Sequence, residues 1–199
     1  LKEELNPKFF DEALRLKFEI AQSFKDGVRM HLFGWGKMPK WLPAYDQAIS
    51  IYDEVISTIP RDDLAAKALY SKGQLYAQMG ELKSSIETFR VLIRRFPKHL
   101  LSPDAYLEII NVYLTKCQNN FPDSDNLDQA EITLRKFYVH FPNEPRINDG
   151  QTLILKIKEY LANDLLYTAN FYKKTKKYSA ANIYYSTILK KYPDTNAAI

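Results

Sequence analysis

The residue types that carry out chemistry in enzymes are present in this chain, but their spacing builds no active site. The three histidines, His31, His99 and His140, are too scattered to form a local metal-binding pair. The chain contains no GxGxxG or GxxxxGK(S/T) phosphate motif, no HExxH zinc motif and no GxSxG nucleophile turn. We expect His99 and His140, which flank helix-ending Phe-Pro pairs, to serve helix C-termini. The sequence therefore predicts a protein that is not an enzyme, with no catalytic residue, no metal site and no cofactor.

One cysteine and one acidic loop resemble fragments of functional sites, and both have simpler explanations. Cys117 is the only cysteine, which excludes an internal disulfide, and we expect it to fill apolar space near a helix end. Asp123 and Asp125 open a pattern like that of a calcium-binding loop. However, Leu127 falls on a ligand position and the required glycine is missing, so the sequence favours a solvated loop.

The composition is that of an ordinary soluble protein with a continuous core, because 46% of the 199 residues are hydrophobic and 26% are charged. No apolar run approaches the ~18 residues needed to span a bilayer. The net charge is +4, and residues 151–199 carry eight lysines against three acidic residues. The cluster of Lys173, Lys174, Lys176 and Lys177 fits an acidic partner or an anionic membrane surface, and its simpler interpretation is a solvated helix face.

The stretch 64–97 fits the 34-residue tetratricopeptide repeat nearly position for position. That repeat needs two small residues, two aromatic residues and a closing proline at fixed offsets, which here are Gly73, Tyr76, Ser85, Phe89 and Pro97. The small residues let two antiparallel helices approach closely, and the aromatic rings fill the space around the contact. One such hairpin cannot bury its own apolar face, so we expect further repeats.

The rest of the chain supplies those repeats. The predicted repeats are 9–60 with an insertion at 28–43, then 64–97, then 102–142 with an insertion at 119–126, then 147–193, and the start of a further repeat at 194–199. The third repeat's second helix is expected at 127–140, and the fourth repeat's first helix from near Ile147 to about Lys174. The sequence therefore predicts an all-α fold, a tetratricopeptide-repeat superhelix of about four helix-turn-helix repeats in a single domain over 1–199.

The inner surface of such a superhelix is lined by the first helix of each repeat, and we expect it to bind a peptide or protein partner. By spacing it presents Lys67, Tyr70, Gln74, Leu107, Asn111, Leu166, Asn170 and Lys173. Asn111 and Asn170 share one repeat position, where an amide can hold an extended peptide backbone or simply face water. In the 28–43 insertion, Trp35 and Trp41 either contact a partner or cap the exposed end of the array.

Two segments resemble the BamD/ComL family of outer-membrane assembly lipoproteins. They are LDQAEITLRKFYVHFPNEP at 127–145 and KEYLANDLLYTANFYKKTKKYSAANIYYSTILKKYPDT at 158–195, and the resemblance extends over about 64–195. Its more specific elements are the insertion in the third repeat and the overlong helix that leads into the fourth.

The resemblance implies a lipid-anchored, five-repeat scaffold of the β-barrel assembly machinery on the periplasmic face of the outer membrane of Gram-negative cells. In that family, N-terminal repeats are associated with client recognition and C-terminal repeats with docking to the barrel-forming subunit. The implied partners are that subunit, other assembly lipoproteins and unfolded outer-membrane protein clients. Membrane contact would come from an N-terminal lipid anchor, which these residues do not include, and we expect a fifth repeat beyond 199.

Two other classes of function fit the same sequence. A general tetratricopeptide adapter, in periplasmic envelope coordination or as a secretion chaperone, would have these repeats without an acylated N-terminus. A hydrolase or transferase with a helical accessory domain would need a catalytic domain outside these residues. Nucleic acid is not an expected partner, because the 14 tyrosines and 11 phenylalanines lie mostly at the core spacing of the repeats.

Overall fold

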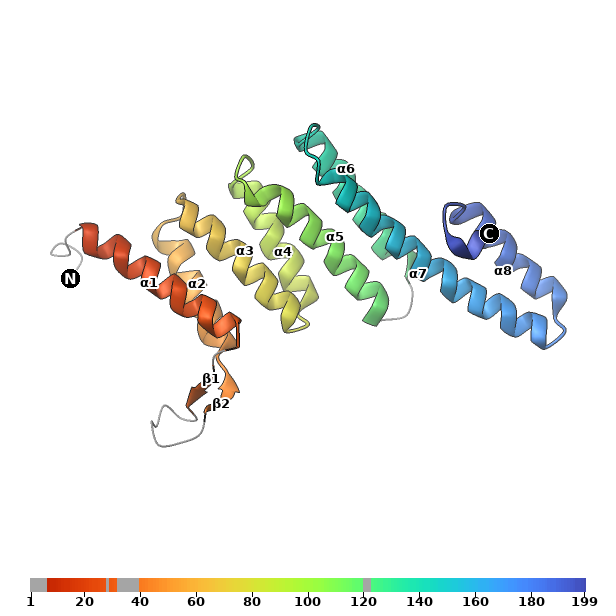
Figure 1. Ribbon diagram of the computed structural model, residues 1–199, viewed down its shortest axis with the longest axis horizontal. Helices are drawn as coiled ribbons and strands as arrows, with labels where there is room; N and C mark the ends of the chain where they lie inside the picture. The colour runs from red at the N-terminus through yellow and green to blue at the C-terminus, as the bar shows by residue number, and fades with distance from the viewer. Residues whose placement is uncertain (1–6, 28, 32–39, 120–122) are drawn as a thin grey trace. The chain divides into compact units, whose positions relative to one another are not determined.

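The computed structural model describes residues 7–27, 29–31, 40–119 and 123–199 (Figure 1). Helices dominate these ranges, which confirms the predicted all-α fold of tetratricopeptide type. In order, the elements are α1 (Pro7–Lys25), β1 (Arg29–His31), β2 (Lys40–Pro43), α2 (Tyr45–Thr58), α3 (Asp63–Gln78), α4 (Leu82–Arg95), α5 (Leu101–Asn119), α6 (Ser124–His140), α7 (Ile147–Lys174), α8 (Tyr178–Lys191) and a 3₁₀ turn, η2 (Asn196–Ala198). The chain divides into two compact units, Leu1–Ala105 and Tyr106–Ile199. That the chain forms one domain stays a prediction.

In the first unit, α1 pairs with α2 and α3 pairs with α4, and α2 also packs on α3 (Figure 1). Small residues stand where α1 and α2 meet, because Ala21 and Ala48 are both fully buried. The ring of Tyr52 is also fully buried, with its centroid 6.0 Å from that of Phe18. The first hairpin therefore uses the same combination of small and aromatic residues as the repeat pattern.

The α3–α4 hairpin shows the close approach that the repeat pattern predicts. A Cβ atom added to Gly73 would lie only 2.7 Å from Cε1 of Phe89, whose ring is fully buried. The hydroxyl of Ser85 donates a hydrogen bond of 2.8 Å to the carbonyl of Gly73. The absent Cβ and the short serine side chain together bring the two helices into contact.

The insertion at 28–43 was expected to be a long loop, and its described parts instead pair as two antiparallel strands. In this pairing Arg29 lies opposite Pro43 and Met30 opposite Leu42, with a register irregularity between Met30 and His31. Alternation between apolar and polar residues is hard to recognise in segments of three and four residues, so the pairing cannot be predicted from the sequence. Trp35 lies outside the described residues.

The expected role of His99 at a helix C-terminus is wrong. Its Nε2 atom lies 2.8 Å from a carboxylate oxygen of Asp63 at the start of α3, and its Nδ1 accepts a hydrogen bond of 3.1 Å from the backbone N–H of Leu101 at the start of α5. His140 does lie in the last turn of α6, but its Nδ1 contacts the hydroxyl of Tyr106 at 2.5 Å. Both imidazoles therefore join separate helices.

In the second unit, α6 begins at Ser124, three residues earlier than predicted. The carboxylate of Asp123 accepts a hydrogen bond of 3.0 Å from the backbone N–H of Asp125 and so caps the helix. The aspartates that resemble a calcium loop therefore start a helix. Cys117 near the end of α5 is fully buried, as its predicted role as an apolar filler requires, and burial raises the pKa of its thiol.

Helix α7 confirms the predicted long helix, with 28 residues from Ile147 to Lys174. Its N-terminal half runs beside α6 and its C-terminal half beside α8 (Figure 1). Gly150 lies in the first turn of the helix, at a place where neighbouring side chains leave no room for a Cβ atom. Such an atom would be 2.6 Å from Leu134 of α6 and 3.4 Å from Leu107 of α5. This close approach holds three helices together in the second unit.

The α7–α8 hairpin has alanines at the two small-residue positions of the repeat, and both Ala169 and Ala181 are buried. After α8 the chain makes a single 3₁₀ turn, η2, where the sequence predicts the first turn of another helix. The backbone N–H and side-chain amide of Asn196 both donate to one carboxylate oxygen of Glu159, at 2.7 and 2.8 Å, which ties this turn back to α7.

Candidate partner-binding groove

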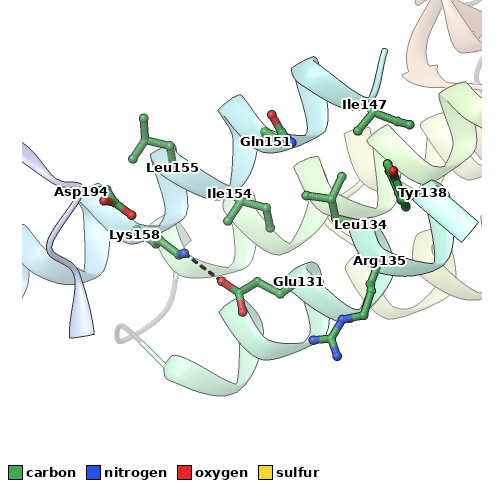
Figure 2. Close-up of a pocket in the computed structure, with 10 residues that line it drawn as sticks. All are labelled: Glu131, Leu134, Arg135, Tyr138, Ile147, Gln151, Ile154, Leu155, Lys158 and Asp194. Carbon is green, nitrogen blue, oxygen red and sulfur yellow. Dashed lines mark ion pairs between the residues drawn. The ribbon is translucent and has the colours of Figure 1, made fainter. Parts of the chain in front are cut away.

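An open groove of about 500 Å³ lies along α6 and the N-terminal half of α7 (Figure 2). It is lined by Glu131, Leu134, Arg135, Tyr138, Ile147, Gln151, Ile154, Leu155, Lys158 and Asp194. The α6 residues recur at intervals of three and four, which puts them on one helix face, and the α7 residues do the same. Asp194, from the segment after α8, closes one end. All these residues belong to the second unit.

The floor of the groove is apolar. Ile147 and Ile154 of α7 are buried at 8% and 7% exposure, and Leu134 of α6 packs between them and Gly150. Two larger apolar side chains stay accessible on the walls: Tyr138 is 57% exposed and Leu155 is 41% exposed. Covering such a side chain completely is worth about 1.5–3 kcal/mol, so these two residues are the strongest apolar contacts the groove offers.

The rim of the groove is charged, with both signs present. The ammonium of Lys158 on α7 lies 3.0 Å from the carboxylate of Glu131 on α6, which links the two helices across the groove (Figure 2). Both side chains are partly exposed, so the pair stabilises the fold by less than about 1 kcal/mol. Arg135 and Asp194 add one more charge of each sign. The rim can therefore orient a partner without selecting for one sign of charge.

The lining holds no cysteine, serine or histidine. Across the ranges that the structure describes, no three His, Cys, Asp or Glu residues gather in a way that could hold a metal ion. Among the same residues, no helix combines the length and apolarity needed to cross a membrane.

None of the eight candidate residues on helices α3, α5 and α7 lines this groove. In the first unit, Lys67 is exposed and pairs with Asp63 at 2.7 Å, its neighbour one turn earlier. The ring of Tyr70 lies edge-on to Phe89 at 5.7 Å between centroids. The side-chain oxygen of Gln74 accepts a hydrogen bond from the Lys25 ammonium. Lys67 and Tyr70 thus make contacts inside the α3–α4 hairpin, whereas Gln74 contacts the end of α1.

The second-unit candidates are also partly committed to the fold. Leu107 is half-buried beside Gly150, and Leu166 is half-buried on α7. Asn170 is exposed and its amide oxygen accepts a hydrogen bond of 2.9 Å from the hydroxyl of Tyr185. Asn111 and Lys173 are exposed. Trp41 lies in β2. Peptide binding by any of these residues, or by Trp35, stays a prediction.

Sequence reasoning missed the groove because it assigned each helix to a single repeat. A helix of 28 residues is about twice the length needed to pair with the 14-residue α8, so its first half had to pair with another helix. The apolar residues Ile147, Ile154 and Leu155 recur at helical spacing in that first half. The extra length of α7 is therefore the sequence feature that could have indicated the groove.

Comparisons with known proteins match both units. The family described as "Outer membrane lipoprotein" matches residues 114–199, which include all ten residues that line the groove. The family described as "Tetratricopeptide repeat" matches residues 67–99, within the α3–α4 hairpin and the turn that follows it. The outer membrane protein assembly factor BamD of Vibrio cholerae is 24% identical over 183 residues, covering 68% of this chain and 76% of the relative. Together with the paired helices, these matches show that the chain is similar to BamD and to tetratricopeptide-repeat proteins.

Proposed function

We propose that this protein is a non-enzymatic scaffold in the assembly of outer-membrane proteins. The proposal is supported by the likeness to an outer-membrane protein assembly factor and by the lipoprotein family that matches its second unit. The observation that carries it is the α6–α7 groove, whose apolar floor and charged rim suit a protein segment.

The groove binds its partner through two kinds of contact. Tyr138 and Leu155 cover apolar side chains of the partner, and their large exposed apolar area makes them the residues on which most of the binding energy depends. Arg135 and Asp194 on the rim fix its orientation through charge. The partners that this proposal names are the barrel-forming assembly subunit, other assembly lipoproteins and unfolded outer-membrane protein clients.

The location that follows is the periplasmic face of the outer membrane, with the full-length protein held by a lipid anchor. The description of the matching family as an outer membrane lipoprotein supports this location. A lipid-modified N-terminal cysteine, identified by mass spectrometry of the full-length protein, is the expected result. A full-length protein that is recovered without an acyl chain, from a soluble fraction, would instead favour a general tetratricopeptide adapter.

The groove is tested by co-purification from detergent-solubilised envelopes. The double variant Tyr138→Ala/Leu155→Asp should reduce recovery of the barrel-forming subunit at least tenfold, because it removes the two exposed apolar walls and adds a charge. The matched control is Ile132→Asp/Val139→Ala, which makes the same changes at exposed apolar residues of α6 outside the groove. Equal losses in the two variants would contradict the role of the groove, and circular dichroism confirms that both variants keep their helices.

A further inference from the structure

The turn between α7 and α8 concentrates positive charge at one end of the second unit. We define the basic tip as Phe171, Lys173, Lys174, Lys176, Lys177 and Tyr178. All four lysines are exposed. The corresponding positions of the α3–α4 turn, 96 residues earlier, hold no lysine: they are Ala77, Gln78, Gly80 and Glu81. The charge is therefore a property of this turn and is not required by the repeat.

No acidic residue neutralises the basic tip. The sequence has no aspartate or glutamate between Asp164 and Asp194. Asp164 precedes Lys174 by ten residues of the same helix, which is about 15 Å and more than the distance over which salt screens exposed charges. In the described part of the chain, none of the four lysines forms a salt bridge through its side chain. The tip thus carries four uncompensated positive charges.

Exposed aromatic rings accompany these charges. Phe171 is 56% exposed and Tyr178 is 65% exposed, and Tyr167, one helical turn before Phe171, is 77% exposed. The residue of α3 that corresponds to Phe171 is Leu75, which is fully buried. Aromatic side chains beside lysines are the composition that settles at the boundary between lipid headgroups and acyl chains.

The backbone of the turn holds one lysine in an unusual conformation. Lys176 has a φ of 60°, in the left-handed region, whereas the corresponding residue of the α3–α4 turn is Gly80 with a φ of 79°. Both turns are closed by the same backbone hydrogen bonds, including one of 2.9 Å from the next residue's N–H. A glycine would adopt this conformation without strain. A lysine at position 176 therefore adds a fourth positive charge to the turn at the expense of backbone strain.

We propose that the basic tip docks on the surface of a membrane that contains anionic phospholipids. The four lysines meet the phosphate groups, and Phe171 and Tyr178 enter the headgroup region. Lysine acts as a mobile point charge, which suits a fluid layer of phosphates, whereas a carboxylate partner is better matched by the fixed fork of arginine. The sequence has no arginine after Arg146. This site goes beyond the proposed scaffold function and is independent of the groove.

The test is sedimentation of the full chain with lipid vesicles. Vesicles with equal amounts of phosphatidylglycerol and phosphatidylcholine should bind the protein at an ionic strength of ~0.15 M and release it at ~1 M. Vesicles of phosphatidylcholine alone should not bind it. The double variant Lys176→Gln/Lys177→Gln should weaken binding about 25-fold, since each lysine near such a surface contributes about a factor of five.

The matched control is Lys190→Gln/Lys191→Gln, which removes the same charge from the far end of α8 and should change binding less than twofold. A second variant guards against loss of folding: Lys176→Gly removes one charge and relieves the left-handed strain, so it should weaken vesicle binding about fivefold while the fold becomes more resistant to denaturant. The groove variant Tyr138→Ala/Leu155→Asp should bind vesicles like the wild type, so that failure of this proposal is separate from failure of the scaffold function.

Three results would overturn the proposal. They are an absence of binding to the anionic vesicles, equal losses in the two double variants, and undiminished binding by the Lys176→Gly variant. A protein that ignores vesicles but binds polyglutamate through the same lysines would also overturn it, and would assign the basic tip to an acidic protein partner.

Discussion

The α3–α4 and α7–α8 hairpins share one repeat pattern, offset by 96 residues, but they pack by different means. In the first, Gly73 admits the fully buried ring of Phe89. In the second, Ala169 has a side chain at the corresponding position, and Tyr185 stays half-exposed and uses its hydroxyl to bond Asn170. The same spacing thus supports a tightly packed core in one hairpin and an aromatic surface in the other.

A second difference lies at the crossing serine. Ser85 bonds the carbonyl of Gly73, and its counterpart Ala181 has no polar atom in its side chain. The aromatic rings of the α7–α8 hairpin are also less buried: Tyr172 stacks on Tyr184 at 5.5 Å between centroids, and both side chains are half-exposed. The repeat pattern sets where helices meet, while the residue chosen at each position sets how much apolar surface is left for a ligand. Each prediction below tests a part of this difference.

The largest expected effect comes from the buried ring of Phe89 in the α3–α4 hairpin. Phe89→Ala should lower the free energy of unfolding by about 3–5 kcal/mol, because it leaves a large cavity in a fully buried site. Tyr185→Ala in the other hairpin should cost about 1 kcal/mol, since that ring is already half-exposed. Urea unfolding followed by circular dichroism measures both values. Equal costs would show that the two hairpins are packed alike.

The next effect concerns the missing side chain of Gly73. Gly73→Ala should destabilise the protein by about 1–3 kcal/mol, because its Cβ would lie 2.7–2.9 Å from three atoms of a buried ring. The reverse change, Ala169→Gly, should cost about 1 kcal/mol through helix propensity alone. Hydrogen exchange of the amides in α4 and α8 locates the change. A stabilised Gly73→Ala variant would mean that the Phe89 ring can move aside.

The crossing serine should have a moderate effect. Ser85→Ala removes a buried hydrogen bond of 2.8 Å to Gly73 and should cost about 1 kcal/mol. The matched change Ala181→Ser places a hydroxyl at the corresponding position of the other hairpin, where the residue that corresponds to Gly73 is Ala169. We expect no gain in stability there. Thermal unfolding of the two variants provides the comparison, and a neutral Ser85→Ala would remove this distinction between the hairpins.

The two turns should respond in opposite directions to a change of one residue. Lys176→Gly relieves the backbone strain of a lysine in the left-handed region, and it also increases the conformational entropy of the unfolded chain. The net effect should be a stabilisation of about 0.5 kcal/mol. Gly80→Ala, where no atom lies within 4 Å of the new Cβ, should destabilise it by about 1 kcal/mol through backbone strain. Guanidinium unfolding resolves both shifts. Changes of the same sign would show that the two turns are not equivalent.

The smallest effect is a pH dependence of the α3–α4 hairpin. Hydrogen bonds from Lys67 and then from His99 lower the pKa of Asp63. A carboxyl with a lowered pKa in the folded state stabilises the fold above its unfolded pKa of about 3.9, and this contribution is lost as the pH falls through the folded value. Asp63 is mostly exposed, so the contribution is below about 1 kcal/mol.

The check is unfolding of wild type and Asp63→Asn between pH 7 and acid. The variant should be less stable than the wild type at neutral pH, and the difference should shrink as the pH falls through the folded pKa of Asp63. The corresponding residue of the other hairpin, Glu159, bonds the neutral Asn196. A difference that stays constant with pH would show that the charge of Asp63 has no part in it.

How much of this structure the sequence predicts depends on whether the signal is local. The bounds of α7 were predicted correctly because no glycine turn, proline or other breaker interrupts 151–174, and Gly150 is tolerated by packing against Leu134. The start of α6 was missed because a cap formed by Asp123 extends the helix into a polar segment. The paired strands β1 and β2 were missed because they are too short to show alternation.

The candidate site was less predictable because it depends on contacts between helices. The spacing of Lys67, Tyr70 and Gln74 identified a helix face, but could not reveal that Asp63, Phe89 and Lys25 already occupy that face. The groove arises where two helices from different repeats lie side by side, and only α7's length indicates it. The lysines of the basic tip can be recognised in the sequence. The exposure of Phe171 and the left-handed backbone of Lys176 can be seen only in the structure.

One consequence follows from the continuity of α7. An uninterrupted α-helix of 28 residues is a stiff strut about 42 Å long, and it carries the groove in its first half and the basic tip at its end. Ile154 and Lys174 are separated by twenty residues, or about 30 Å along the axis. With the tip docked on a lipid surface as proposed, the distance along α7 between tip and groove stays constant, so a partner seated in the groove comes closer to that surface only if the whole helix tilts.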